Sequence, residues 1–129
     1  MGVPKEIVQK ILEAGVRAPS GSNSQPWEFR IKDNVIEIIA IPEKDHPILN
    51  FKNRGTLIAH GALIENIVIA ASQFGHEALI RLFPIPEEKN ITAHIFLTAS
   101  GQKEDLLHKA INLRTTNRKP YKLSRVSSS

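Results

Sequence analysis

The chain has 129 residues, no cysteine and a formal net charge of +4. This length predicts one domain that can bury a core without disulfides or bound metal. The missing cysteine excludes disulfides, thiolate metal sites and cysteine nucleophiles. The first ten residues hold no apolar stretch of the kind found in secretory signals, so a cytoplasmic protein is expected.

The first half of the chain predicts a helix followed by a β-hairpin. Apolar residues at helical spacing follow Pro4, which suits a first helical turn, and Pro19 ends that helix. Residues 27–32 alternate as strands do, residues 35–41 are a second predicted strand, and an Asp-Asn pair between them is a tight-turn signal. A long connection then leads to the second half.

The second half predicts a helix over residues 56–74 that is apolar almost all round and therefore central and buried. Strands at 78–83 and 92–98 follow. The last predicted helix, 102–112, has these residues turned inward: Leu106, Leu107, Ala110 and Ile111. Because a hairpin comes first and helices separate the later strands, the predicted fold class is α+β.

The stretch 17–31, RAPSGSNSQPWEFRI, concentrates turn-forming and hydrogen-bonding residues before Trp27, the only tryptophan. Gly21 permits an unusual backbone angle and the close approach of a ligand. Neutral hydroxyls and amides suit the polar edge of a planar, uncharged heteroaromatic ring. The alternative is an ordinary loop whose Ser and Asn side chains cap local backbone groups. In either case Trp27 is expected to anchor the loop in the core.

The C-terminal stretch from Lys109 onward is basic and contains no Asp or Glu. Within it, RTTNRKPY places Arg114 and Arg118 on either side of two threonines. Guanidinium groups beside a hydroxyl favour a phosphate ligand, since they form several charge-assisted hydrogen bonds in fixed geometry. A solvated basic tail is the main alternative. A nucleic-acid contact is less favoured, since only Tyr121 could stack on a base.

Other chemistries find little support in the sequence. The five histidines are scattered without ligand spacing, so no metal site is predicted. His60 lies within the apolar 56–74 helix, where a hydrogen-bonded core histidine is expected. With Glu65 and Asn66 also inside it, this helix is expected in a protein core and not in a membrane. The sequence also contains neither the G-x-S-x-G nucleophile motif nor a Walker phosphate-binding loop.

Three segments resemble the FMN-dependent nitroreductase superfamily. APSGSNSQPWEF (18–29) is similar to that family's signature loop, and GALIENIVIAASQFGHE (61–77) to its buried central helix. RTTNRKPY (114–121) is similar to the Arg-x-Ser-x-Arg segment that holds the flavin phosphate. Their order looks most like the first half of the predicted nitroreductases of Acg type, which hold two halves in tandem. The resemblance implies a nitroreductase-like α+β fold, a sheet with flanking helices and a buried central helix.

The resemblance also implies a function and a site. It implies an FMN-dependent NAD(P)H oxidoreductase that reduces nitroaromatics or quinones by ping-pong hydride transfer through the flavin. The alternative is a flavin-binding or storage protein, or the inactive half of a larger nitroreductase, without turnover. Carried over to this chain, the resemblance implies that the flavin ring is contacted by Pro19, Ser20, Gly21 and Asn23. It implies that the flavin phosphate is held by Arg114, Thr116 and Arg118.

One departure from the family concerns the order of the motifs. Single-domain members carry the Arg segment ahead of the polar loop, whereas here it comes last. We therefore expect a partial, apparently truncated nitroreductase-like domain at residues 1–113, followed by a basic segment at 114–129. A homodimer is expected, in which the loop of one copy meets Arg114 and Arg118 of the other. Asn66 matches a recurring polar position of the central helix, and a structural role is expected for it.

Overall fold

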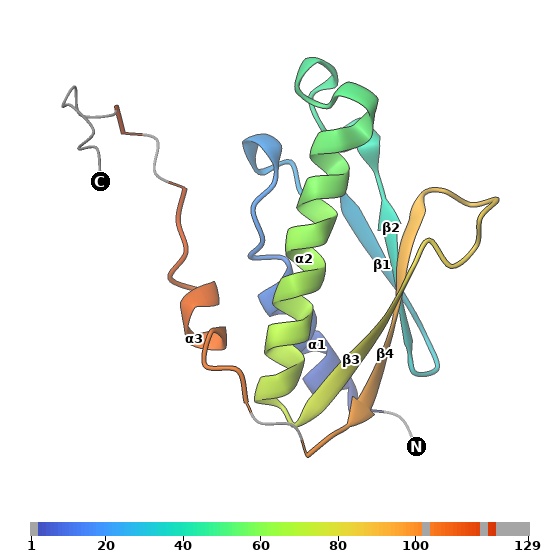
Figure 1. Cartoon of the computed structure of the whole chain (residues 1–129), viewed down its shortest axis with the longest axis vertical. Helices are drawn as coiled ribbons and strands as arrows, with labels where there is room; N and C mark the ends of the chain where they lie inside the picture. Colours follow the sequence, from blue (N-terminus) through green and yellow to red (C-terminus); the bar gives the residue numbers. More distant parts are fainter. Residues whose placement is uncertain (1–2, 102–103, 117–118, 121–129) are drawn as a thin grey trace, which may run out of the picture.

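The computed structural model describes residues 3–101, 104–116 and 119–120, and Figure 1 shows how its elements are arranged. Two long helices lie on one face of a four-stranded sheet. In chain order the helices and strands are α1 (Lys5–Gly15), β1 (Trp27–Lys32), β2 (Val35–Ala40), α2 (Arg54–Gln73), β3 (His76–Leu82), β4 (Ile91–Ala99) and α3 (His108–Ile111). All four strands and the central helix agree with the predicted ranges to within about two residues, which is the usual uncertainty of element ends.

The sheet is antiparallel throughout, with strand order β1-β2-β4-β3. β1 and β2 form the predicted hairpin, in which Trp27 pairs with Ala40. Asp33 in the turn has a positive φ of 55°, as tight hairpin turns require. Alternate residues of β2 and β4 face the helices and form the core with them: Ile36, Ile38, Ala93, Ile95 and Leu97. The predicted α+β class is confirmed.

The two long helices approach each other closely at Gly15. A Cβ added there would stand 2.8 Å from Ile67 Cγ1 and 3.2 Å from Leu63 Cδ1, so the absent side chain is what allows this contact. One turn away, Asn66 Nδ2 donates a hydrogen bond to the Ala14 carbonyl at 3.3 Å. The structural role expected for Asn66 is confirmed, because its amide joins α2 to the end of α1.

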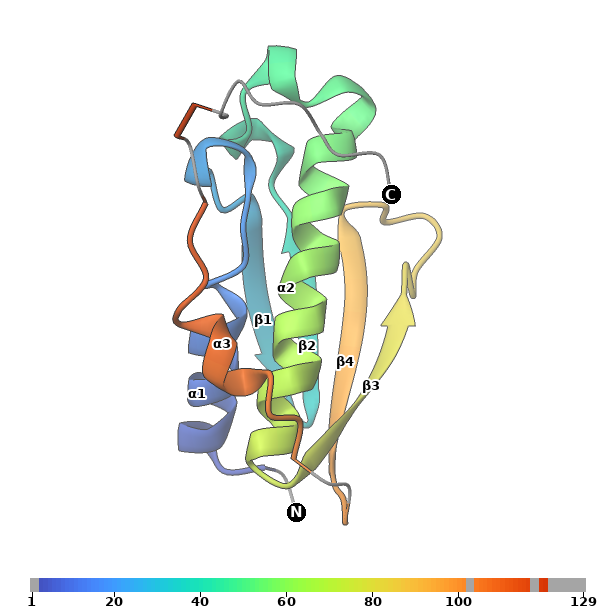
Figure 2. The same ribbon diagram turned by 60° about the vertical axis from the view of Figure 1, so that its left-hand side comes forward.

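The central helix α2 is buried all round only near its C-terminal end, where the four consecutive residues Ile69, Ala70, Ala71 and Ser72 are buried. Its sheet-facing side contributes to the core, and the helix ends before Gly75, whose φ of 72° supplies the predicted stop. On the outer side Leu57 and Ile58 are exposed, Ile58 by 74%. Among the described residues, α3 lies against the C-terminal half of this side and the N-terminal half is open (Figure 2). The prediction that this helix is buried on all sides was therefore wrong for its N-terminal half.

The apolar character of α2 also bears on membranes. By length and composition, the segment Phe51–Gln73 could cross one. Half of its most apolar window is buried inside the fold, as in the core helix of many globular proteins, so this feature is weak evidence for a membrane span.

The last helix is much shorter than predicted. Only four residues, His108–Ile111, are helical, and residues 102–103 lie outside the described part. Leu106 and Leu107 were expected to face inward but are 66% and 59% exposed, and Ala110 is exposed as well. The preceding Asp105 explains the late start, since its backbone N–H donates to Ser72 Oγ and its side chain accepts from Leu107 N. Ile111 is buried, as predicted.

Candidate functional site

The polar loop, defined here as residues 18–26, joins α1 to β1 and has an unusual backbone. It contains a 3-10 turn at Gly21–Asn23. Ser22, Asn23 and Gln25 have positive φ angles of 50°, 54° and 49°. Left-handed backbone costs an L-residue roughly 1–2 kcal/mol, and less for Asn. Three such residues within four positions persist only where surrounding contacts hold them, and strain of this kind gathers at ligand sites.

Several hydrogen bonds hold the polar loop in this shape. Within the loop, Gln25 N donates to Ser20 Oγ at 3.0 Å. Ser24 Oγ donates to the Asp45 carboxylate, which comes from the connection between β2 and α2. At the exit of the loop, the Pro26 carbonyl accepts from His60 Nε2 at 2.9 Å and from Ile41 N at 3.0 Å. The loop is thus tied to α2 and, through Ile41 and Asp45, to the connection that follows β2.

Asp45 belongs to a buried polar cluster beneath the polar loop. Its second oxygen accepts from Thr56 Oγ1, and Thr56 exchanges two hydrogen bonds with Asn50, each of 2.9 Å. All three residues are buried, and only 8% of the Asp45 surface is exposed. No feature of the sequence predicted this cluster. A single Asp in a proline-containing connection carries no periodicity or motif from which its burial could be read.

His60 is the hydrogen-bonded core histidine that was predicted. It is buried, and its Nδ1 lies 2.8 Å from Thr92 Oγ1 while Nε2 contacts the Pro26 carbonyl. Because a carbonyl only accepts, Nε2 carries a proton. Burial lowers the pKa of His60 below its ordinary value of 6.5, against the raising effects of the Pro26 carbonyl and of nearby Asp45. The neutral ring is therefore the favoured form at neutral pH.

The residues predicted to contact a flavin ring lie together at the surface of the polar loop. Pro19, Gly21 and Asn23 are exposed, and Ser20 is half-buried. Asn23 is the last residue of the 3-10 turn, and its backbone N–H donates to the Ser20 carbonyl at 3.0 Å, whereas its side-chain amide has no hydrogen-bond partner among the described residues. Beneath them Trp27 is 5% exposed, so the anchoring role predicted for it is confirmed. The loop therefore offers neutral donors and acceptors on its outer side over a fixed base.

The C-terminal arginine segment lies beside the polar loop of the same chain (Figure 2). Arg114 Nη2 donates to the Arg17 carbonyl at 3.0 Å, and its Nη1 contacts Thr116 Oγ1 at 3.4 Å. In return, the Arg17 guanidinium reaches the Asn112 carbonyl at 3.5 Å. No ion pair to a described carboxylate involves either arginine. Arg118, also predicted at this site, lies outside the described residues.

Arg17 was not among the residues predicted for the site. It directly precedes the polar loop, and both it and Arg114 are exposed. Two exposed cations side by side, without a carboxylate among the described residues to neutralise them, favour an anionic ligand. The structure thus places a basic group next to the polar loop within one chain, so this proximity does not depend on a second copy.

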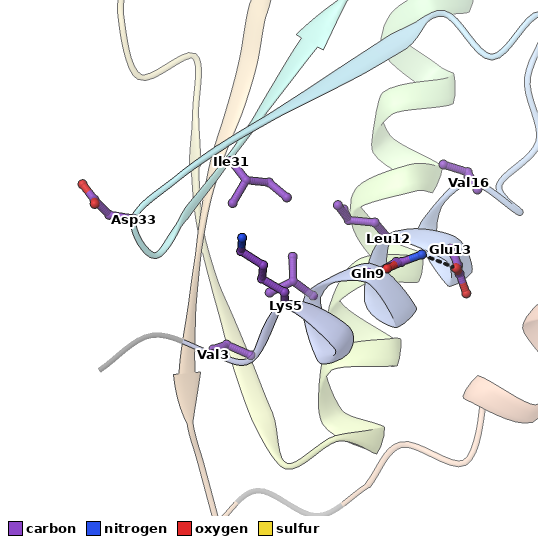
Figure 3. A pocket seen from close by; sticks show the side chains of 9 residues that line it. Val3, Lys5, Gln9, Leu12, Glu13, Val16, Ile31 and Asp33 are labelled. Carbon is purple, nitrogen blue, oxygen red and sulfur yellow. Dashed lines mark hydrogen bonds between the residues drawn. The ribbon is translucent and has the colours of Figure 1, made fainter.

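A separate surface groove lies away from the polar loop. This groove of about 720 Å³ runs between the outer side of α1 and the β1–β2 turn (Figure 3). Its floor is apolar, with Val8, Leu12 and Ile31 among the lining residues, and Gln9 and Glu13 at its rim are hydrogen-bonded to each other at 3.2 Å. None of the predicted site residues lines it. The groove is therefore not part of the candidate site.

Known proteins resemble this chain in sequence. A family model described as "Nitroreductase family" matches residues 1–47, which include α1, the polar loop and the β1–β2 hairpin. "Putative NAD(P)H nitroreductase Rv3131" of Mycobacterium tuberculosis is 29% identical over 118 residues, covering 90% of this chain and 34% of the relative. "Putative NAD(P)H nitroreductase acg" of the same organism is 25% identical over 122 residues, which cover 92% of this chain and 37% of that relative. The chain spans about a third of the length of these curated relatives.

Solved structures resemble this chain in fold. A crystal structure from Desulfovibrio desulfuricans, described as a "putative nitroreductase in complex with FMN", matches with a TM-score of 0.62 at 21% identity. The match covers 99% of this chain and 88% of that chain. At this level of identity the match speaks for the fold alone, and it confirms the fold that the sequence resemblance implied.

Proposed function

We propose that this chain, whose sequence and fold resemble those of the nitroreductase family, forms the flavin-binding part of an FMN-dependent NAD(P)H oxidoreductase that reduces nitroaromatics or quinones. The polar loop carries the proposal. It presents Asn23 and exposed backbone from a strained but firmly held turn, next to two arginines. When bound, FMN would supply hydride and electron transfer, while the chain supplies binding, orientation and electrostatics.

The donor groups of the described site suit the two ends of FMN. The loop residues Pro19, Ser20, Gly21 and Asn23 would lie along the uncharged ring, whose carbonyls and ring nitrogens need single, neutral hydrogen-bond partners. Arg114 and Thr116, with Arg118, would hold the phosphate, which needs charge-assisted bonds. We add Arg17 to this group, because its guanidinium lies beside the Arg114 segment.

A homodimer is part of the proposal. The open half of the α2 outer side exposes Leu57 and Ile58, and β3 exposes Ile80 and Leu82 beside it. Apolar groups of this kind, in neighbouring elements, favour contact with a second protein surface. Sedimentation of the purified chain with and without FMN tests this part. A monomer in both samples contradicts it.

The domain division and the cellular location also belong to the proposal. We propose that residues 1–113 act as one unit and that 114–129 act as a basic segment that binds phosphate. The contact between Arg114 and Arg17 supports such a role for the start of the segment. A cytoplasmic location is proposed from the absence of cysteine and the family resemblance.

A second candidate function is flavin binding without turnover. This alternative is favoured because the chain spans only about a third of the length of its curated relatives. Residues that complete a working site in those relatives can then lie in the part that this chain does not match. In this case the chain would bind FMN but leave NAD(P)H unoxidised.

A visible absorption spectrum after FMN addition and desalting tests the proposal first. A retained flavin band with shifted maxima is expected, and NAD(P)H consumption with a quinone or nitroaromatic then separates the enzyme from the binding protein. A colourless protein after desalting would contradict both candidate functions. Riboflavin serves as a matched ligand, since it has the same ring and lacks the phosphate.

A further inference from the structure

The carboxylate of Asp45 occupies a special place beneath the polar loop. It is buried, and its two oxygens accept from two different elements, Ser24 of the loop and Thr56 in the first turn of α2. An added Cβ at Gly21 would stand 3.6 Å from the same oxygen that binds Ser24. Asp45 therefore lies directly behind the loop residues to which the proposed function assigns the flavin ring.

We infer that Asp45 is the positioning residue of the polar loop: one carboxylate oxygen holds Ser24, the other holds Thr56, and together they set the orientation in which Gly21 and Asn23 meet a flavin ring. The identity of the ligand in this inference rests on the proposed function, whereas the loop geometry rests on the hydrogen bonds of Asp45. Asp45 does not touch the ring side of the loop, so it acts through Ser24 and is not a catalytic residue.

The support behind Asp45 is rigid. Thr56 is fixed on α2 and shares two hydrogen bonds with Asn50, so the carboxylate is joined to a helix and not to another mobile loop. The exit of the loop is held independently, because His60 of the same helix binds the Pro26 carbonyl. One helix thus holds the loop at two points, and the strained residues Ser22 and Asn23 precede both of them. Such second-layer support is what keeps a ligand-binding constellation in its productive geometry.

The inference predicts a specific pattern of ligand affinity. Asp45→Ala and Ser24→Ala each remove the bond that holds the loop, and a hydrogen bond to a charged group corresponds to about tenfold or more in affinity. Because the loop is assigned to the ring and not to the phosphate, FMN and riboflavin should lose the same factor. Asp45→Asn should restore most of the affinity, since its amide can accept from Thr56 and donate to Ser24.

Asp45→Asn has a second expected effect, on the reduction potential of bound flavin. A carboxylate behind the loop that would carry the ring disfavours the negative charge that the ring gains on reduction. Removing that charge while keeping the hydrogen bonds should raise the midpoint potential. A residue with a purely structural role would leave the potential unchanged.

Glu37→Ala is the matched control. Glu37 is also a partly buried carboxylate whose two oxygens each contact a side chain, Arg30 and His94, both at 3.0 Å. It lies on β2, on the face of the sheet opposite the core, and is therefore remote from the polar loop. Glu37→Ala is expected to lower stability without changing flavin affinity. If Asp45→Ala does not fold, Ser24→Ala alone carries the comparison.

Hydrogen exchange keeps this test separate from the test of the proposed function. The amides of Ser24 and Gln25 donate to the Gly21 carbonyl and to Ser20 Oγ, both at 3.0 Å, so they report the loop turn directly. They should exchange faster in Ser24→Ala and Asp45→Ala than in Glu37→Ala, with or without flavin. If the wild-type chain binds no flavin, the proposed function fails while exchange still decides the positioning role. Unchanged exchange, or a loss of FMN affinity with riboflavin affinity intact, overturns the inference.

Discussion

Arg114 donates a hydrogen bond from Nη2 to the backbone carbonyl of Arg17 at 3.0 Å, across 97 positions of sequence. This contact brings the basic C-terminal segment to the first residue before the polar loop. It joins the two parts of the proposed flavin site, one that suits a neutral ring and one that suits a phosphate, within a single chain.

The first prediction concerns these two arginines. Arg114→Ala and Arg17→Ala should each weaken FMN binding by about tenfold or more, because charge-assisted hydrogen bonds to a phosphate are worth roughly 1.5–3 kcal/mol. Riboflavin affinity should stay nearly unchanged. Titrations of both ligands, followed by flavin fluorescence, measure this. Arg30→Ala, an exposed arginine on β1, is the control, and an equal loss for FMN and riboflavin would argue against a phosphate site.

The second prediction separates the Asn23 side chain from its backbone. Asn23→Gly keeps the left-handed backbone, with φ near 54° in the wild type, but removes the amide. The free energy of unfolding should change by less than about 1 kcal/mol, while the affinity for both flavins falls and the absorption maxima shift. Urea unfolding and flavin titration together measure the two effects. Unchanged flavin binding would remove Asn23 from the site.

The third prediction concerns the stability of the protein as a function of pH. The pKa of His60 is lowered in the folded protein, so the unfolded chain binds the proton more readily near its ordinary value of 6.5. The free energy of unfolding should therefore fall as the pH drops below about 6.5 and reach a plateau above that value. His60→Gln can still donate to the Pro26 carbonyl but does not titrate.

Urea unfolding of both proteins between pH 5.5 and 7.5, a range of about one unit to either side of the ordinary histidine pKa, measures this effect. The difference in the free energy of unfolding between the wild type and His60→Gln should become smaller as the pH falls. The comparison isolates His60, since all other titrating groups are shared. A constant difference across the range would contradict the lowered pKa.

The fourth prediction uses two helix-associated glycines with opposite surroundings. Gly15→Ala should destabilise the protein by about 1–3 kcal/mol, because the new methyl group would stand 2.8 Å from Ile67 Cγ1. Gly61→Ala meets no atom within 4 Å on the exposed side of α2 and should stabilise the protein by up to about 1 kcal/mol. Thermal or urea unfolding gives the sign of each change. Destabilisation by Gly61→Ala would indicate that the outer side of α2 is covered in solution.

The sequence by itself determined the elements and the fold class. The alternation in β1, the apolar α2 and the turn residues at Asp33 and Gly75 are local signals, and local propensities agreed with the fold at these places. The polar loop, with its anchor Trp27, was also visible as a candidate site. These features depend on residues that are close in sequence, so a pattern reveals them.

Only the tertiary structure decided what lies behind and beside the polar loop. Asp45 meets Ser24 and Thr56 from a connection without periodicity, and Arg114 meets Arg17 from the other end of the chain. The same limit explains the error at Leu106 and Leu107, where the contact of Asp105 with Ser72 replaced a helical turn. Long-range hydrogen bonds of single polar residues leave no trace in spacing or composition, because each depends on how distant elements pack.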